Sequence, residues 1–336
     1  MAIILGIEST AHTFGVAVAR NGKILSNVKS SYKTERGGII PMEAAKHHQE
    51  NKRKIYSESL LVSGIKEEDI DAIAISQGPG LAPCLLQGMG FAKELAEKLK
   101  KPVVPVNHCI AHLEIGRMRT PKLGHSGAKD PVMLYASGAN TQIIAYASGK
   151  FRVFGETLDI GIGNFIDTFA RYAGIGFPGG PVIEKLAAES SQLIKLPYKV
   201  KGMDIALSGI LTNLKQKLES GKYRLQDLAF SLQETVFAML VETSERALAH
   251  TEKKELLLGG GVACNKRLQE MCKIMCGERG ARFFCPENQF LVDNAAMIAY
   301  LGEIMFKSGI GIPYTELEKL DIKPRQRTDD VEVTWR

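Results

Sequence analysis

Short hydrophobic runs punctuated by glycine recur along the whole chain, and they alternate with longer stretches that suit helices. In the first half the pattern predicts strands at 2–7, 14–19, 23–28, 71–76 and 102–106, with helices near 41–63 and 84–100. In the second half it predicts strands at 132–136, 142–147, 151–154, 255–258 and 282–285, with helices at 225–250, 264–277 and 293–307. Both halves therefore run strand–strand–strand–helix–strand–helix–strand.

That order predicts an α/β fold in which each half forms a mixed sheet covered by helices on both faces. Because the order occurs twice, we expect a duplicated domain with a cleft between the copies. The stretch 120–131, which contains glycine, proline and lysine, marks the boundary and divides the chain into 1–125 and 126–336. The segment 174–223 interrupts the repeat and is interpreted as an insertion in the second copy. The alternative is one large α/β domain whose halves resemble each other by accident.

The composition narrows the class of protein. The 336 residues, 45% hydrophobic and 24% charged, suit a globular chain of about two domains. The six cysteines form no CxxC pair, so we expect a reducing, cytoplasmic environment, or a nuclear one if the source is eukaryotic. No hydrophobic run approaches about 18 residues, and Glu8 comes too early for a signal peptide, so no membrane partner is expected. The net charge of +6 permits an anionic partner such as RNA or a nucleotide.

Two histidines carry the clearest candidate chemistry. His108 and His112 stand in NHCIAH, and residues four apart share one face of a helix, so both imidazoles can bind one metal ion. A zinc peptidase with this spacing needs a glutamate directly after the first histidine, and Cys109 stands there instead. Tyr135 and Asp293 are candidates for further ligands, and such a mixed nitrogen and oxygen set suits iron better than a closed structural zinc site. The alternative is a pair of histidines that only pack locally.

Three turns rich in glycine or small polar residues follow predicted strands. They lie in LGIESTAHTFGVAV, LYASGANTQIIAY and LLLGGGVACNKRL. Such turns bring backbone N–H groups close to phosphate or carboxylate oxygens, and the third also opens a helix whose N-terminus favours anions. Ordinary hairpins use the same residues, but three such turns in two repeated halves favour a nucleotide site. The chain has no complete GxxxxGK[ST] or GxGxxG, which disfavours P-loop and Rossmann sites.

Two further sets of polar residues have an ordinary structural alternative. Asp167 and Glu184 lie near glycine-rich stretches of the second half, where carboxylates accept hydrogen bonds from ribose hydroxyls; the alternative is helix capping. Lys323, Arg325 and Arg327 stand close together in the C-terminal tail, where they either contact RNA or are simply solvated.

Taken together, the motifs resemble those of the TsaD family, the catalytic subunit of tRNA threonylcarbamoyladenosine synthesis. The resemblance is closest to the archaeal and eukaryotic branch, which acts within the KEOPS complex. The motifs are GIESTAHT, PMEAAKHH, SQGPGL, VNHCIAH, LYASGANTQ, FGETLDIGIGN, LPYKVKGMD, SLQET, GGGVACNKRL, DNAAMIAY and RTDDVEV, and they cover essentially the whole chain. The resemblance implies the actin-like, sugar-kinase and heat-shock-chaperone ATPase superfold, which is built from two ribonuclease-H-like halves.

The resemblance also implies a set of site residues. The implied metal ligands are His108, His112, Tyr135 and Asp293. The implied contacts to the adenylate are Tyr135, Ala136, Ser137, Gly138, Ala139, Asp167, Gly180, Glu184, Gly260, Gly261 and Asn265. Four positions depart from the family pattern, in which glycine is usual: Ser9, Ala82, Ala139 and Ala295. Ala139 would be strained if its backbone needed a positive φ.

The implied activity is acyl transfer that depends on a metal. A threonylcarbamoyl group, activated as threonylcarbamoyl-AMP, passes to the adenosine next to the anticodon in tRNAs that read codons beginning with A. The implied cofactors are one divalent metal ion per subunit, best matched by iron with zinc or magnesium as alternatives, and ATP or AMP as the bound nucleotide. The implied partners are tRNA and the small atypical kinase subunit and small dimerising subunit of a KEOPS-type complex.

Two other functions stay open from the sequence. One is an ATP-dependent kinase for a sugar or a carboxylate, which shares the superfold but has no need of the two histidines. The other is a non-catalytic ATP-binding scaffold that organises partner subunits.

Overall fold

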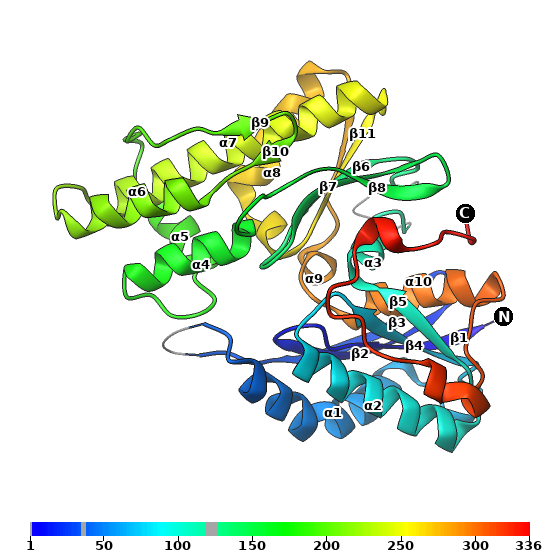
Figure 1. The fold of residues 1–336 in the computed structure, drawn as a ribbon. Coiled ribbons are helices and arrows are strands. Elements are labelled where there is room, and N and C mark those ends of the chain that lie inside the picture. The colour runs from blue at the N-terminus through cyan, green and yellow to red at the C-terminus, as the bar shows by residue number, and fades with distance from the viewer. Residues whose placement is uncertain (1, 35–37, 119–126) are drawn as a thin grey trace.

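The computed structural model describes residues 2–34, 38–118 and 127–336, and within them two five-stranded sheets form the framework (Figure 1). The first sheet has the order β3-β2-β1-β4-β5, with β1 (Ile3–Glu8), β2 (Thr13–Arg20), β3 (Lys23–Ser31), β4 (Ala72–Gly78) and β5 (Val103–Asn107). The second has the order β12-β11-β6-β7-β8, with β6 (Val132–Ala136), β7 (Thr141–Ala147), β8 (Lys150–Glu156), β11 (Glu255–Gly259) and β12 (Arg282–Phe284).

The two sheets have the same topology. In each half the first three strands are antiparallel neighbours, and the two later strands join the sheet in parallel. Parallel strands need crossover connections, and helices supply them in both halves. The predicted α/β fold with a repeated order of elements is therefore confirmed.

Helices α1 (Pro41–Ser63) and α2 (Ala82–Leu99) cover one face of the first sheet. Phe14 on β2, Tyr56 on α1 and Phe91 on α2 pack ring against ring there, with centroid distances of 6.2 Å from Phe91 to Phe14 and 5.7 Å to Tyr56. Helix α1 has proline in its first turn and ends at Gly64, whose φ of 65° suits glycine. The central strand β4 is buried along its whole length, as expected for a parallel strand covered on both faces.

Helices α3 (His108–Ile115) and α10 (Ala295–Lys307) lie between the two sheets (Figure 1). One hydrophobic cluster joins Ile4 of the first sheet to Met133 of the second through these two helices. Gly6 lets α10 approach β1 closely, because a Cβ at Gly6 would lie 2.5 Å from the backbone nitrogen of Ala299. Helix α10 belongs to the predicted second range, 126–336, yet it packs on the first sheet. The predicted boundary between residues 125 and 126 lies outside the described residues.

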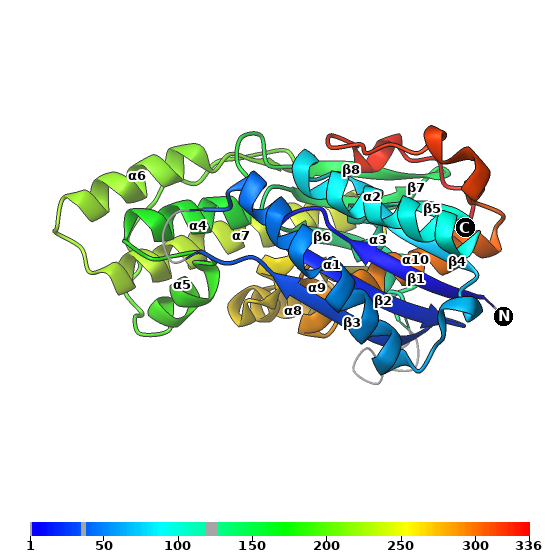
Figure 2. The same cartoon turned by 90° about the horizontal axis from the view of Figure 1, so that it is seen from below.

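The helices α7 (Leu225–Thr251) and α8 (Lys266–Glu278) pack on the other face of the second sheet. Before them come α4 (Ile162–Tyr172), α5 (Gly180–Ala187), the small pair β9 (Val200–Lys201) and β10 (Asp204–Ile205), and α6 (Ser208–Glu219). The predicted insertion, 174–223, thus holds the elements from α5 to α6. Both views place α5 and α6 at the end of the molecule opposite the N-terminus (Figures 1 and 2).

Short helical turns complete the described chain: η1 (Glu67–Asp69), η2 (Gly261–Cys264), α9 (Asn288–Leu291), η3 (Tyr314–Lys319) and η4 (Thr328–Asp330). The segment from η3 to η4 crosses from the first sheet to the second. In the part of the chain that the structure describes, no helix combines the length and the hydrophobicity needed to cross a membrane.

Candidate metal centre

The metal candidates gather at one edge of the first sheet. Strands β1, β4 and β5 run parallel, so their carboxyl ends meet at this edge. Helix α3 begins there directly after β5, and the side chain of Asn107 caps it by accepting a hydrogen bond from the N–H of Ile110 at 3.1 Å. His108 and His112 lie one turn apart on this helix, both buried, with ring centroids 4.8 Å apart.

Asp293 closes the cluster from the loop before α10. Its Oδ1 lies 3.5 Å from Nε2 of His108 and 3.9 Å from Nε2 of His112. The three ligand atoms lie within 4.8 Å of one another, which is a spacing that one cation can bridge. The sequence places Asp293 far from the two histidines, and the fold brings it to them.

Tyr135, the fourth predicted ligand, packs its ring against His112 with a centroid distance of 5.2 Å. The side chain is fully buried at the end of β6. Burial raises the pKa of Tyr135 above its usual value, and the neighbouring Cys109 and Asp293 raise it further. The phenol is therefore neutral in the metal-free protein, and only a nearby cation would favour its phenolate.

The donor set fits a metal ion on a specific observation. Among the described residues, neither ring nitrogen of buried His112 has a hydrogen-bond partner. Buried polar groups without a partner are rare in folded proteins, and a ligand explains such a group. Two imidazoles, a carboxylate and a phenol are ligands that suit iron or zinc, with an open position left for substrate.

Glu8, at the end of β1, holds His108 from behind. Its Oε2 lies 3.0 Å from Nδ1 of His108, while its Oε1 accepts hydrogen bonds from the N–H of Thr10 at 2.7 Å and from the hydroxyl of Thr10 at 2.5 Å. Glu8 is fully buried. A proton on Nδ1 is thereby directed to Glu8, and the lone pair of Nε2 would be available to a cation held together with Asp293.

The charged groups of the cluster shift one another's pKa values. Burial acts to lower the pKa of His108, but the carboxylates of Glu8 and Asp293 raise it above its ordinary value. Burial lowers the pKa of His112, against the opposing effect of Asp293. Burial acts to raise the pKa of Asp293, yet the two histidines hold it below its usual range. Asp293 is therefore an anion ready to bind a cation.

The turn Ala136–Ala139 lies next to the metal candidates, directly after Tyr135. The N–H of Ser137 donates to the carbonyl of Asn140 at 2.9 Å, and the carbonyls of Ser137 and Gly138 accept from the first N–H groups of α4. Gly260 packs on this turn with a φ of 89°, and a Cβ there would lie 2.4 Å from the carbonyl oxygen of Ala136.

The Gly259–Gly261 turn also reaches the metal candidates. A Cβ at Gly259 would lie 3.7 Å from Cβ of His112. The two predicted nucleotide turns of the second half are thus adjacent to each other and to His112.

The remaining predicted contacts stand at two helix starts. At the start of α5, the carboxylate of Asp167 accepts from the N–H of Gly179 at 2.8 Å, next to Gly180. Burial raises the pKa of Asp167, while N–H donors from this helix start lower it. At the start of α8, Glu184 accepts from the N–H of Lys266 at 2.8 Å, and Asn265 caps the helix. In this structure the two carboxylates therefore act as helix caps, and their predicted ribose contacts stay a prediction.

None of the four departures from the family pattern strains the backbone. The described residues other than glycine with a positive φ are Asn21, Lys100, Ser148 and Glu252. Ala139, Ala82 and Ala295 thus need no glycine conformation. Ser9 is accommodated by Gly88, since a Cβ at Gly88 would lie 2.0 Å from the hydroxyl of Ser9.

Three residues of this site are not among the residues predicted from the sequence. Glu8, Thr10 and His12 lie in the first small polar turn, GIESTAHT, whose pattern predicts only a backbone anion site. Nδ1 of His12 lies 3.8 Å from Oδ2 of Asp293, and its ring packs edge-on against Phe177 at 5.5 Å. The signal was present, since polar residues at the carboxyl end of a buried parallel strand often face a site.

Comparison with known proteins gives a consistent family match. A family model described as "TsaD: tRNA N6-adenosine threonylcarbamoyltransferase" matches residues 23–300. A protein of Thermococcus kodakarensis named tRNA N6-adenosine threonylcarbamoyltransferase is 53% identical over 333 residues, which cover 99% of both chains. A Methanosarcina mazei protein named as probable bifunctional tRNA threonylcarbamoyladenosine biosynthesis protein is 51% identical, over 99% of this chain and 59% of its own.

Solved structures with a similar fold are much more distant in sequence. HypF of T. kodakarensis superposes with a TM-score of 0.63 at 14% identity, over 91% of this chain and 48% of that one. An activator of 2-hydroxyisocaproyl-CoA dehydratase from Clostridium difficile, solved with bound ADPNP, has a TM-score of 0.50 at 10% identity, over 95% of each chain. These likenesses support the fold alone.

Proposed function

Because the chain belongs to the TsaD family of tRNA N6-adenosine threonylcarbamoyltransferases, we propose that it transfers a threonylcarbamoyl group to the N6 amine of a tRNA adenosine. The donor is threonylcarbamoyl-AMP, and the acceptor is the adenosine next to the anticodon of tRNAs that read codons beginning with A. The observation that carries the proposal is the cluster of buried His108 and His112 with half-buried Asp293, which lies against two turns suited to a nucleotide.

The reaction makes clear demands on the protein. The lone pair of the N6 amine is delocalised into the purine, so this amine is a poor nucleophile. During transfer, the bond from the carbamoyl carbon to the phosphate oxygen breaks and a bond from that carbon to N6 forms. AMP leaves with the electron pair, and N6 loses a proton. Orienting both reactants and stabilising charge on the carbonyl oxygen are the effects that lower this barrier.

The residues that would hold a divalent metal ion are His108, His112, Tyr135 and Asp293. When bound, the ion supplies Lewis acidity toward the carbamoyl carbonyl. We assign iron as the best match to this donor set, with zinc and magnesium as alternatives. Glu8 orients His108 through its Nδ1, and Nδ1 of His12 lies 3.8 Å from Oδ2 of Asp293.

The nucleotide part of the donor, or ATP or AMP, is assigned to the second half. The turn Ala136–Ala139 and the pair Gly260 and Gly261 let a flat base or a ribose approach the backbone. Asn265 and Glu184 stand at the start of α8, and Asp167 and Gly180 at the start of α5. Helix starts attract anions, and the two carboxylates can exchange a backbone partner for ribose hydroxyls.

We propose direct transfer, without a covalent enzyme intermediate. Cys109 follows His108 directly on α3, and burial raises the pKa of its thiol to about 12. A thiol of this kind is neutral at pH 7 and inert as a nucleophile. Trapping an acyl group on Cys109 would contradict this assignment.

We also assign the chain to a KEOPS-type complex in the cytoplasm, with a small atypical kinase subunit and a small dimerising subunit as partners. The Methanosarcina relatives, whose chains are longer than this one and are named as bifunctional, support only the coarser point that a second function accompanies this one in those proteins.

The test is nucleoside analysis of tRNA by mass after incubation with the protein, its partner subunits and threonylcarbamoyl-AMP. We expect threonylcarbamoyladenosine with the wild-type protein and with His250→Ala, which changes an exposed histidine in the last turn of α7. We expect none above background with His112→Ala. Phosphorylation of a sugar or carboxylate without modified tRNA would favour the kinase instead. ATP binding with no reaction would favour the scaffold.

A further inference from the structure

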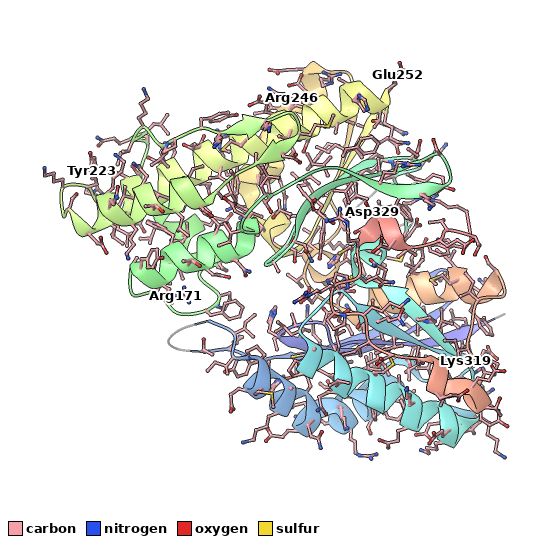
Figure 3. All side chains as sticks on the ribbon, viewed as in Figure 1. Arg171, Tyr223, Arg246, Glu252, Lys319 and Asp329 are labelled. Carbon is pink, nitrogen blue, oxygen red and sulfur yellow. The ribbon has the colours of Figure 1, made fainter. Side chains whose placement is uncertain are left out.

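The C-terminal segment 320–336 runs across both sheets and is tied to the first one beside the metal centre. Figure 3 labels Lys319 below and Asp329 above, before and inside this segment. The N–H of Lys323 donates to the carbonyl of Gln77 at 2.8 Å, and the N–H of Gly80 donates to the carbonyl of Pro324 at 3.1 Å. A Cβ at Gly78 would lie 1.9 Å from the carbonyl oxygen of Lys323, so the two backbones are in close contact.

These contacts connect the segment to the residues around His108. The N–H of Leu81 donates to the carbonyl of Thr10 at 2.7 Å. The hydroxyl oxygen of the same Thr10 lies 3.2 Å from Nδ1 of His108. Further along, Oε1 of Gln326 accepts from the side chain of Asn107, the cap residue directly before His108, at 3.1 Å. The segment is therefore fixed in position at the beginning of α3.

Residues 323–330 form an open hollow of about 500 Å³, lined by Lys323, Pro324, Arg325, Gln326 and Asp330. Lys323 and Arg325 are exposed and make no ion pair with any described residue. Arg327, in contrast, is engaged by Glu156 at 3.5 Å and by Asp329 at 2.9 Å.

The lining therefore offers two unengaged cations on an ordered backbone. Asp330 is the one acidic residue in the lining, and its carboxylate accepts from the backbone N–H of Arg327 at 3.4 Å. Lysine and arginine side chains presented in this way are typical contacts for phosphate oxygens.

We propose that this hollow, defined by residues 323–330, binds the phosphate backbone of the tRNA substrate beside the target nucleotide. The inference rests on the proposed function, because a base that reaches the metal centre places its flanking phosphates next to the start of α3. A polyanionic ligand matches the two free cations and the net charge of +6. Lys323 and Arg325 position the tRNA, and they take no part in the chemistry.

The test is the double variant Lys323→Glu, Arg325→Glu in the 336-residue metal-loaded chain. We expect its Kd for tRNA to rise at least about tenfold, and its salt dependence to weaken by about two phosphate contacts. The matched control is Arg20→Glu, Lys23→Glu. These exposed cations flank the turn between β2 and β3. In the β-ladder Arg20 stands opposite Ile3, the first residue of β1, so the control lies at the amino-terminal end of β1, whereas the hollow lies at the carboxyl end of β4. The control should bind tRNA like the wild type.

A double variant that binds tRNA within twofold of the wild type, with the same salt dependence, overturns the proposal. If that variant instead loses an acidic protein partner, the hollow is a protein-binding surface and the proposal fails. Two results separate this inference from the proposed function. Weakened tRNA binding in a chain that never forms the modified nucleoside supports the hollow and refutes the function. Full modification at subsaturating tRNA by the double variant refutes the hollow and supports the function.

Discussion

Replacing Glu8 with glutamine tests whether the buried carboxylate sets the ligand face of His108. The amide oxygen of the introduced glutamine can keep the hydrogen bonds from Thr10, so its NH₂ group then faces Nδ1 of His108. Because an amide NH₂ only donates, Nδ1 must become an acceptor, and the ring proton moves to Nε2. Nε2 then points a proton, not a lone pair, at Asp293 and the metal position.

The size of the effect follows from the bonds that change. A hydrogen bond to a charged group is worth about 1.5–3 kcal/mol, and loss of such a support for a metal-binding histidine weakens metal affinity by roughly 10–100-fold. The measurement is the Kd for iron or zinc by competition with a chelator, together with the free energy of unfolding of the metal-free protein. Glu8→Asp keeps a carboxylate and should recover part of the affinity.

Glu303→Gln is the matched control for Glu8→Gln. Glu303 is also a buried carboxylate, and it accepts from the N–H of Gly22 at 2.9 Å and from Lys307 at 2.5 Å, neither of which belongs to the cluster. It should lower stability by a similar amount and leave the metal affinity unchanged. If Glu8→Gln binds metal as tightly as Glu303→Gln does, Glu8 has no role in orienting His108.

Three further predictions follow from particular contacts. His112→Ala and Asp293→Asn should each bring bound metal from about one equivalent to under about 0.1, measured by elemental analysis, because a site built from few protein ligands fails without one of them; retention of a full equivalent would place the metal elsewhere. Gly260→Ala should lower the free energy of unfolding in urea by at least about 2 kcal/mol, because its φ of 89° and the carbonyl of Ala136 at 2.4 Å both oppose a Cβ. Gly280→Ala, with a φ of 65° and open space, should cost only about 1 kcal/mol, so equal costs would show that the turn can shift. Burial and the neighbouring His47 lower the pKa of His48 to about 4. The unfolded chain therefore binds more protons between about pH 6.5 and pH 4, and stability falls as pH falls through that window, by about 2 kcal/mol between pH 7 and pH 5. Urea unfolding of the wild type and of His48→Gln at both pH values measures the difference, and equal pH dependence would show that His48 is not buried as a neutral ring.

Local signals explain why much of the fold could be predicted from the sequence. The helix expected at 41–63 is Pro41–Ser63, since proline in its first turn and Gly64 at its end mark both limits. His108 and His112 share a face because Asn107 caps a helix that starts directly after a strand. These features depend on neighbours in the chain, so the sequence alone carries them.

The rest depends on contacts between distant segments. The hydrophobic residues of α10 predict a buried helix, but they do not say that Gly6 and Gly15 of the first sheet make room for it. Glu8 is an ordinary strand end until the fold places His108 beside it. Asp167 and Glu184 suit capping and ribose binding equally well, because both roles use the same carboxylate oxygens. Nor does any local pattern indicate that Arg327 is held by Glu156 while Arg325 is left without an ion pair among the described residues.

The central claim is that this chain joins a threonylcarbamoyl group to a tRNA adenosine at the cluster of His108, His112 and Asp293. One measurement tests it most directly: a single-turnover reaction with preformed threonylcarbamoyl-AMP, tRNA and the partner subunits, read out by mass analysis of the tRNA nucleosides. The wild-type protein should convert the adenosine next to the anticodon, and His112→Ala should leave it unchanged. Equal conversion by both proteins, or none by the wild type, would contradict the account.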